Sequence, residues 1–246
     1  MARNKATDKT LFNKYRLDDL YKISMKTILE AEGGILIIPT NFFTDEKSIE
    51  IRQQFLSVFQ ILQLNIFTKP VFETTTYSVC SFAFKRNKNN KQQINVNIEP
   101  EGITTTIELN SEYNYRLAGE FYSSLESVPI KFGRLMETEN PNEYTTHIKL
   151  YAIDTRTDPI RVEYDEIPFH GKNTDRTYAT LTCKYPLTKE QEIILIEEFN
   201  SRLKTFRDKY YNLSMTNYRD YNRKRIGFTF AYQLMSLIYE EKIIDK

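Results

Sequence analysis

The sequence predicts an α/β protein in two parts, in which the end of an open sheet is followed by an α+β region. Two observations carry this prediction. Over residues 1–90, segments with helical spacing alternate with short continuous apolar runs, as in a sheet covered by helices. After a polar, basic stretch at Lys85–Lys91, strict apolar–polar alternation becomes more common. We therefore expect one domain over residues 1–90 and a second over residues 91–246.

Helices and apolar strands follow one another in the first part. Asp18–Glu32 and Lys47–Phe59 have helical spacing, and each precedes a strand-like run. Ile35–Ile38 consists of four apolar residues, which is typical of a strand buried on both faces. Ile61–Phe67 and Thr75–Phe84 are expected to be the next strands. About three strands are few for a sheet of this architecture, so the sheet seen here begins in its middle.

The second part mixes strands and helices. Gln93–Leu109 predicts a β-hairpin with its turn at Glu99–Gly102, and Thr145–Ile153 and Arg176–Tyr185 predict further strands. Thr188-x-x-Gln191 is a capping-box sequence, and it predicts a long helix that ends near Tyr211. A basic loop follows, and Phe228–Tyr239 predicts a final helix.

Composition excludes several classes of protein. With 40% hydrophobic residues among 246, the chain can form a core, and a net charge of +1 gives no global attraction to nucleic acid or membrane. No apolar run reaches the roughly 18 residues of a membrane span, so a cytoplasmic protein without a membrane partner is expected. Cys80 and Cys183 are expected to be buried thiols. His147 and His170 have no neighbours at metal-ligand spacing, so no metal site is predicted.

Several segments resemble one family, the gamma class of methyltransferases that modify adenine in DNA. In that family a Gly-Gly strand ending in Ile-Pro, a helix with an Arg, and a strand with Val-Phe follow one another. The corresponding segments here are Gly33–Phe43, Ile51–Arg52 and Val71–Thr76, and Ala2–Lys5, Thr216–Arg219 and Arg223–Ile226 also look like parts of one branch. The resemblance implies the C-terminal portion of a Rossmann-like methyltransferase sheet followed by a target-recognition domain, in a site-specific enzyme of the restriction-modification type.

The resemblance gives Phe72 a role. An aromatic residue at the matching position of the family stacks on the target adenine after the base has been flipped out of the duplex. A flipped base loses its stacking neighbours, and an aromatic face replaces part of that energy. The alternative is that Phe72 is a core residue at the start of a strand.

The family's donor-binding and catalytic motifs are not found in these residues. S-adenosylmethionine is held in the family by a Gly-rich turn, and the sequence has seven glycines but no Gly-x-Gly. The Asn-Pro-Pro-Tyr tetrad, which accepts hydrogen bonds from the adenine amino group, is also missing, and Asn140-Pro141-Asn142 is its nearest approach. We therefore expect no catalytic residue and no bound S-adenosylmethionine in this chain alone. Both would come from a protein partner that supplies the N-terminal methyltransferase half.

Two basic segments are candidates for contact with double-stranded DNA. Arginine can bind phosphates or guanine edges, and interleaved aromatic and amide side chains can contact bases. The alternative for each segment is a solvated linker or surface loop. The expected DNA-binding residues are Lys85, Arg86 and Lys88 in the first segment and Tyr218, Arg219, Arg223, Lys224 and Arg225 in the second.

Three functional hypotheses remain open at this point. The first is the C-terminal half of a DNA adenine methyltransferase, which recognises DNA and closes the base pocket but is inactive without the N-terminal motifs. The alternative is a non-enzymatic DNA-binding or specificity protein derived from such an enzyme. The third is an interaction module without DNA affinity. A nuclease site at Asp45-Glu46-Lys47 is not favoured, because acidic residues at a helix start are explained by the helix dipole.

Overall fold

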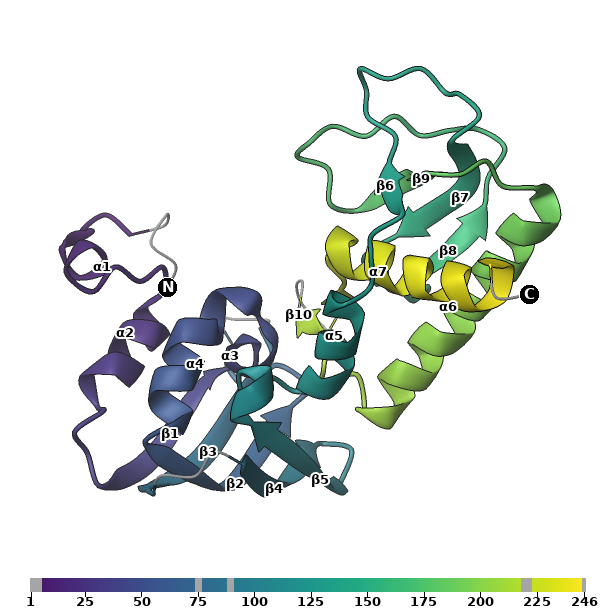
Figure 1. The fold of residues 1–246 in the computed structure, drawn as a ribbon. Helices are drawn as coiled ribbons and strands as arrows, with labels where there is room; N and C mark the ends of the chain where they lie inside the picture. Colours follow the sequence, from purple (N-terminus) through teal and green to yellow (C-terminus); the bar gives the residue numbers. More distant parts are fainter. Residues whose placement is uncertain (1–5, 74–76, 88–90, 218–222, 245–246) are drawn as a thin grey trace. The chain divides into compact units, whose positions relative to one another are not determined.

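The computed structural model describes residues 6–73, 77–87, 91–217 and 223–244. The described residues form two compact units, one up to Gly119 and the other from Glu120 onward. Each unit has its own main sheet and its own helices (Figure 1). The chain is thus a mixed α/β protein, with a mixed five-stranded sheet in the first unit and an antiparallel four-stranded sheet in the second.

The first unit is built on the five-stranded sheet, in the order β1-β3-β2-β4-β5. β2 and β4 are parallel, and every other neighbouring pair is antiparallel. Since β1 and β2 both run antiparallel to β3, they are parallel to each other, and the helices between them form the connection that such strands need. The strands are β1 (Gly33–Pro39), β2 (Phe59–Phe67), β3 (Val79–Arg86), β4 (Lys91–Glu99) and β5 (Ile103–Asn110).

β1 lies at one edge of this sheet. It pairs along its whole length with β3, from Gly33 opposite Lys85 to Pro39 opposite Val79. Ile35 is 76% exposed and Ile37 is 56% exposed, whereas Ile38 is buried. The prediction that this strand is buried on both faces is therefore wrong for the described structure, because the helices of the unit cover only the opposite face of the sheet.

Short helices cover that opposite face (Figure 1). They enclose a cluster of phenylalanine rings whose neighbouring centroids lie 4.7–6.3 Å apart. Such edge-to-face and tilted packing is favourable for aromatic cores. The helices next to the rings are α3 (Asn41–Thr44) and α4 (Ile49–Leu56), whereas α2 (Leu20–Thr27) packs on α4, and α1 (Thr10–Tyr15) packs on α2. The clustered rings are those of Phe42, Phe43, Phe55, Phe59, Phe82 and Phe84.

The open face of the sheet carries a hydrogen-bonded row of polar side chains across four strands. Thr104 Oγ1 donates to Asn97 Oδ1 at 3.0 Å, and Asn97 Nδ2 donates to Asn65 Oδ1 at 2.9 Å. Asn65 Nδ2 then donates to Ser81 Oγ at 3.2 Å. We call these four residues the amide ladder. It gives the open face a polar character over β2–β5, in contrast to the isoleucines of β1.

The boundary between the units falls at Gly119 rather than at residue 90. The hairpin of β4 and β5, expected in the second part, belongs to the first sheet because β4 pairs in parallel with β2 from Leu64 opposite Val96 to Phe67 opposite Glu99. The segment after β5 also packs on this unit, where the amide of Leu117 donates to the carbonyl of Phe43 at 3.0 Å.

The second unit contains the four-stranded antiparallel sheet in the order β6-β9-β7-β8. The long helix α6 packs on β7 and β8, and its Asn200 bonds both the amide and the carbonyl of Val162 at 2.9 Å. The strands are β6 (Phe132–Arg134), β7 (Thr145–Tyr151), β8 (Arg161–Tyr164) and β9 (Tyr178–Cys183), with a separate pair of β10 (Thr216–Asn217) and β11 (Lys224–Arg225). The helices are α5 (Gly119–Glu126), α6 (Lys189–Lys209) and α7 (Phe228–Tyr239), followed by a π-helical turn at Glu240–Ile244.

Several local predictions are confirmed. The capping box at Thr188 and Gln191 begins α6, with both reciprocal hydrogen bonds present. Cys80 and Cys183 are buried and free. Among the described residues, no helix combines the length and the apolar character that crossing a membrane requires. The helix expected at Lys47–Phe59 ends earlier, at Leu56, because β2 already begins at Phe59.

Candidate functional site

Phe72 lies in the loop that follows β2, and it is not part of the core. Its residue is 44% exposed, and the neighbouring Val71 is 48% exposed. A hollow of about 580 Å³ lies beside this loop, where the parallel strands β2 and β4 end. In open α/β sheets, ligands bind beyond the carboxyl ends of the strands. The hollow is lined by Asn65, Phe67, Lys69, Pro70, Val71, Glu99 and Pro100.

Lys85 and Arg86, two of the residues expected to bind DNA through the first basic segment, have different environments. Lys85 is exposed on β3. The guanidinium of Arg86 is half-buried, and it donates to the carbonyl of Leu29 at 2.6 Å and to that of Ala31 at 2.8 Å. It also lies over the ring of Phe59, 5.3 Å from the centroid. Arg86 thus fastens the segment after α2 to the end of β3, and the structure favours a structural role for it. Lys88 lies outside the described residues.

The second basic segment ends in β11, which pairs with the short strand β10 that precedes the segment. Thr216 is opposite Arg225, and Asn217 is opposite Lys224. We call this pair, β10 and β11, the basic hairpin. Tyr218 and Arg219 lie outside the described residues, whereas Arg223 and Arg225 are half-buried at its end.

Lys224 is enclosed by the second unit. It is 3% exposed, and its Nζ donates to Oδ1 of Asn217 across the basic hairpin. Burial lowers the pKa of Lys224 to about 7; the nearby Asp154 acts in the opposite direction. A contact with a DNA phosphate requires an accessible ammonium group, so the position of Lys224 favours a structural role over the expected DNA contact.

Asp154 and Arg207 lie beside this lysine and were not predicted from the sequence. The backbone amide of Lys224 donates to Oδ2 of Asp154 at 3.0 Å, and both Nη atoms of Arg207 donate to the same carboxylate. The two partners are 53 positions apart in the sequence. No local motif could have indicated their pairing.

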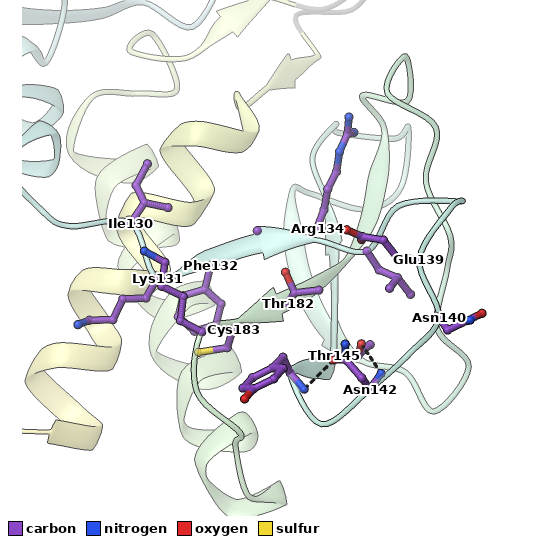
Figure 2. Close-up of a pocket in the computed structure, with 14 residues that line it drawn as sticks. Ile130, Lys131, Phe132, Arg134, Glu139, Asn140, Asn142, Thr145, Thr182 and Cys183 are labelled. Atoms are coloured by element: carbon purple, nitrogen blue, oxygen red, sulfur yellow. Dashed lines mark hydrogen bonds between the residues drawn. The ribbon is translucent and has the colours of Figure 1, made fainter.

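The second unit also contains an open cavity of about 900 Å³ between β6, the end of β9 and the loop before β7 (Figure 2). Asn140 and Asn142, the nearest approach to the catalytic tetrad, line it. The side-chain oxygen of Asn142 accepts a hydrogen bond from the backbone amide of Tyr144 at 2.9 Å, so this side chain stabilises the turn in which it lies. Two cations of the cavity wall have other partners, since Arg134 donates to the carbonyl of Asp175 at 2.6 Å and Lys131 pairs with Glu240.

Other chemistry has little support in the part of the chain that the structure describes. It contains no cluster of three His, Cys, Asp or Glu residues that could hold a metal ion. His147 stacks on Tyr164, and its Nδ1 lies 3.2 Å from Oε2 of Glu192. Burial raises the pKa of Cys80 and of Cys183, which disfavours the reactive thiolate. Asp45 accepts the amide of Lys47 at 3.1 Å, as expected for a helix cap.

Comparisons with known proteins give a distant likeness. No protein-family model and no curated protein sequence matches the chain. Among solved structures, the M protein of the type I restriction enzyme EcoKI is similar over 32% of this chain and 20% of that chain, with 15% identity and a TM-score of 0.28. A modification subunit of a type I restriction enzyme from Vibrio vulnificus YJ016 is similar over 38% of this chain and 19% of that chain, with 16% identity and a TM-score of 0.25. The chain spans about a fifth of each structure, and this likeness identifies no residue of the site.

Proposed function

We propose that these residues form the C-terminal half of a site-specific DNA adenine methyltransferase, which recognises DNA and closes the target-base pocket. The observation that carries the proposal is the state of β1, in the segment where the family resemblance is most specific. One edge of β1 pairs with β3, and no described strand pairs with the other. Ile35 and Ile37 are exposed on the same face of the strand. An unpaired apolar edge strand is suited to accept a neighbouring strand, here the one that carries the tetrad in the family.

The exposed position of Phe72 supports its role in the base pocket. A side chain that stacks on a flipped adenine must be accessible in the free protein, and a core phenylalanine would not be. Its loop lies at the carboxyl ends of parallel strands, beside the hollow lined by Lys69 and Val71. A flipped base there would exchange its lost duplex stacking for contact with an aromatic face.

DNA recognition is assigned to the remaining basic residues. Lys85 is exposed, and Arg219, Arg223 and Arg225 belong to the basic hairpin or to the residues that it connects. Arg86 and Lys224 are left out, because the carbonyl and amide partners described above occupy their charged groups. Phosphate contacts by these residues would give binding that weakens as salt is added.

The described residues do not fit S-adenosylmethionine. The adjacent glycines Gly33 and Gly34 lie inside β1 rather than in a turn between a strand and a helix. A Cβ atom on Gly33 would lie 2.7 Å from the carbonyl oxygen of Phe84, so close strand packing explains this glycine. In this proposal a protein partner that supplies the N-terminal methyltransferase half provides the donor site and the tetrad, and the chain by itself is expected to be catalytically silent.

Complementation tests the proposal. The chain is co-expressed with a fragment of a gamma-class enzyme that carries the Gly-x-Gly turn and the Asn-Pro-Pro-Tyr tetrad. The expected result is a soluble complex that transfers labelled methyl groups to adenine in duplex DNA, while neither part does so alone. Methylation by this chain alone, one-site binding of S-adenosylmethionine to it, or failure to restore activity would count against the proposal.

One observation favours the alternative, a non-enzymatic DNA-binding protein. The basic hairpin is held by residues of its own unit and requires no donor-binding half. The same experiment separates the two functions, because a chain that binds DNA but never forms a complex with the fragment fits only the alternative.

A further inference from the structure

One carboxylate joins three segments of the second unit at the base of the basic hairpin. The carboxylate of Asp154 accepts hydrogen bonds from both Nη atoms of Arg207 on α6, at 2.8 and 2.9 Å. It also accepts hydrogen bonds from the backbone amide of Lys224 on β11 at 3.0 Å and from that of Ile160 at 2.9 Å. Its own amide donates to the carbonyl of Lys224 at 2.9 Å. The helix, the hairpin and the loop after β7 are therefore bound through a single side chain.

The geometry of this contact restrains rotation as well as distance. A guanidinium that binds a carboxylate through two parallel hydrogen bonds fixes the relative orientation of both planes. Nε of Arg207 is held in turn by Oδ1 of Asn212 at 2.6 Å. The side chains of Asp154 and Arg207 are largely buried, so removal of one partner would leave a charge without compensation.

The basic hairpin needs such an anchor because it is very short. Each strand has two residues, and a two-stranded pair of that length is not stable by itself. Backbone contacts connect it to the adjoining segment, among them a bridge between Ile153 and Arg225 and a bond from the amide of Ile226 to the carbonyl of Ala152. The Asp154 carboxylate adds the side-chain part of the attachment.

We infer that Asp154 and Arg207 are positioning residues for DNA recognition, which hold the basic hairpin in one orientation on the second unit. This inference rests on the proposed function. A hairpin fixed before DNA arrives loses less conformational freedom on binding, so its affinity is higher than that of a loose one. Neither residue is expected to touch DNA, because each is engaged with the other.

The test compares Asp154→Asn with a matched control, Asp165→Asn. Asp165 also forms an ion pair in this unit, 2.7 Å from Lys149, but it has no bond to the basic hairpin. Hydrogen exchange of the Lys224 and Ile226 amides should become about tenfold faster in Asp154→Asn and remain unchanged in the control. Affinity for a mixed-sequence DNA duplex should fall by about tenfold, with an unchanged salt dependence, because no phosphate contact is lost.

A second variant guards against general unfolding. Arg207→Lys keeps the positive charge but loses the two-point contact, so its affinity and exchange rates should fall between those of the unaltered chain and Asp154→Asn. Equal protection of the hairpin amides in Asp154→Asn and the unaltered chain would overturn the anchoring, and equal DNA affinity despite a loosened hairpin would overturn the positioning role. If the unaltered chain binds no DNA, the proposed function and the DNA-positioning role both fail. The hydrogen-exchange data still show, independently of DNA, whether Asp154 and Arg207 hold the basic hairpin in place.

Discussion

Lys224 and Asn217 face each other across the basic hairpin, and the buried Nζ of the lysine donates to the amide oxygen of the asparagine. Burial lowers the pKa of Lys224 to about 7. In the unfolded chain the lysine pKa returns to about 10.4. Between about pH 7 and about pH 10, the unfolded state thus binds more protons than the folded state, and the contribution of this lysine to stability increases with pH.

Replacement of this lysine by methionine should remove that pH dependence. Lys224→Met keeps the length of the side chain and avoids the cost of burying an ammonium group. We expect the free energy of unfolding to depend less on pH than that of the unaltered chain, by up to about 1.4 kcal/mol per pH unit within the window. Urea unfolding followed by circular dichroism across this pH range measures the difference. Parallel profiles for the two proteins would contradict the assignment.

Arg52 should be among the most sensitive positions of the first unit. Its buried guanidinium donates to the carbonyls of Asn114, Phe42 and Asp45 at 2.6, 2.7 and 3.1 Å. Burial lowers its pKa to about 10, with a smaller effect from Arg116, so it remains charged at neutral pH. Arg52→Met leaves three carbonyls without this donor and should cost about 3 kcal/mol or more in unfolding free energy.

The matched control is the next residue of α4. Gln53 is exposed and bonds to the Asn114 side chain, so Gln53→Met should cost about 1 kcal/mol or less. Equal losses in the two variants would show that Arg52 has no special role.

Substitution of Arg86 should affect the stability of the fold, whereas substitution of Lys85 should affect DNA binding. Arg86→Ala removes the bonds to Leu29 and Ala31, so it should lower the unfolding free energy by about 1–3 kcal/mol and leave the salt dependence of DNA binding unchanged. Lys85→Ala should have the opposite pattern, with a log–log salt slope reduced by about 0.9. Denaturant unfolding and salt-dependent binding titrations on both variants decide the matter. A reduced salt slope in Arg86→Ala would restore it to the DNA-binding set.

Phe72 should matter for activity and little for folding. Because it is exposed, Phe72→Ala should change the unfolding free energy by no more than about 0.5 kcal/mol. In the complemented complex it should reduce methylation by about tenfold, since stacking on a base contributes about 1–3 kcal/mol. Leu62→Ala, at an exposed apolar residue of β2 that does not line the hollow, is the control for loss of an exposed apolar side chain. Unchanged methyl transfer in Phe72→Ala would end the stacking hypothesis.

On the open face of the first sheet, substitutions on β1 should prevent binding of the N-terminal half, whereas substitutions on β5 should not affect it. Ile37→Lys places a charge on β1, where the N-terminal half is proposed to pack, and should prevent assembly of the complex without unfolding the chain. Thr104→Lys introduces the same side chain on the same face but on β5, at the far end of the amide ladder, and should leave assembly intact. Gel filtration of the co-expressed parts distinguishes these results, and equal behaviour of both variants would refute the proposed site.

Regular elements with strong local signals could be predicted from the sequence. The capping box fixed the start of α6, and apolar periodicity located β1, β2 and α7. The same signals misjudged β1, because a run of isoleucines is buried on both faces only if a second layer is present. The parallel pairing of β4 with β2 was also missed. A hairpin sequence indicates its own two strands and carries no information about the third strand that it joins.

The roles of the candidate site residues could be predicted less well from the sequence, for a physical reason. Exposure and partners are tertiary properties, so Arg86 and Lys224 had the same basic character in the sequence as Lys85 and Arg223. The structure separates Lys85, which is exposed, from Lys224, which is buried, and from Arg86, whose guanidinium binds backbone carbonyls. Asp154 and Arg207 had no local signal, since their contact depends on how α6 folds back on the sheet.

The amide ladder also has a consequence for the register of the first sheet. β2 and β4 pair through only four residue pairs, which is a short stretch on which to fix an alignment. A slip of β4 by one residue would turn Asn97 toward the phenylalanine core and bring Ile98 to the water-facing side. It would also break the bonds from Asn97 to Asn65 and from Thr104 to Asn97. The ladder therefore penalises misaligned pairing during folding, so that polar side chains facing solvent select one arrangement of the strands.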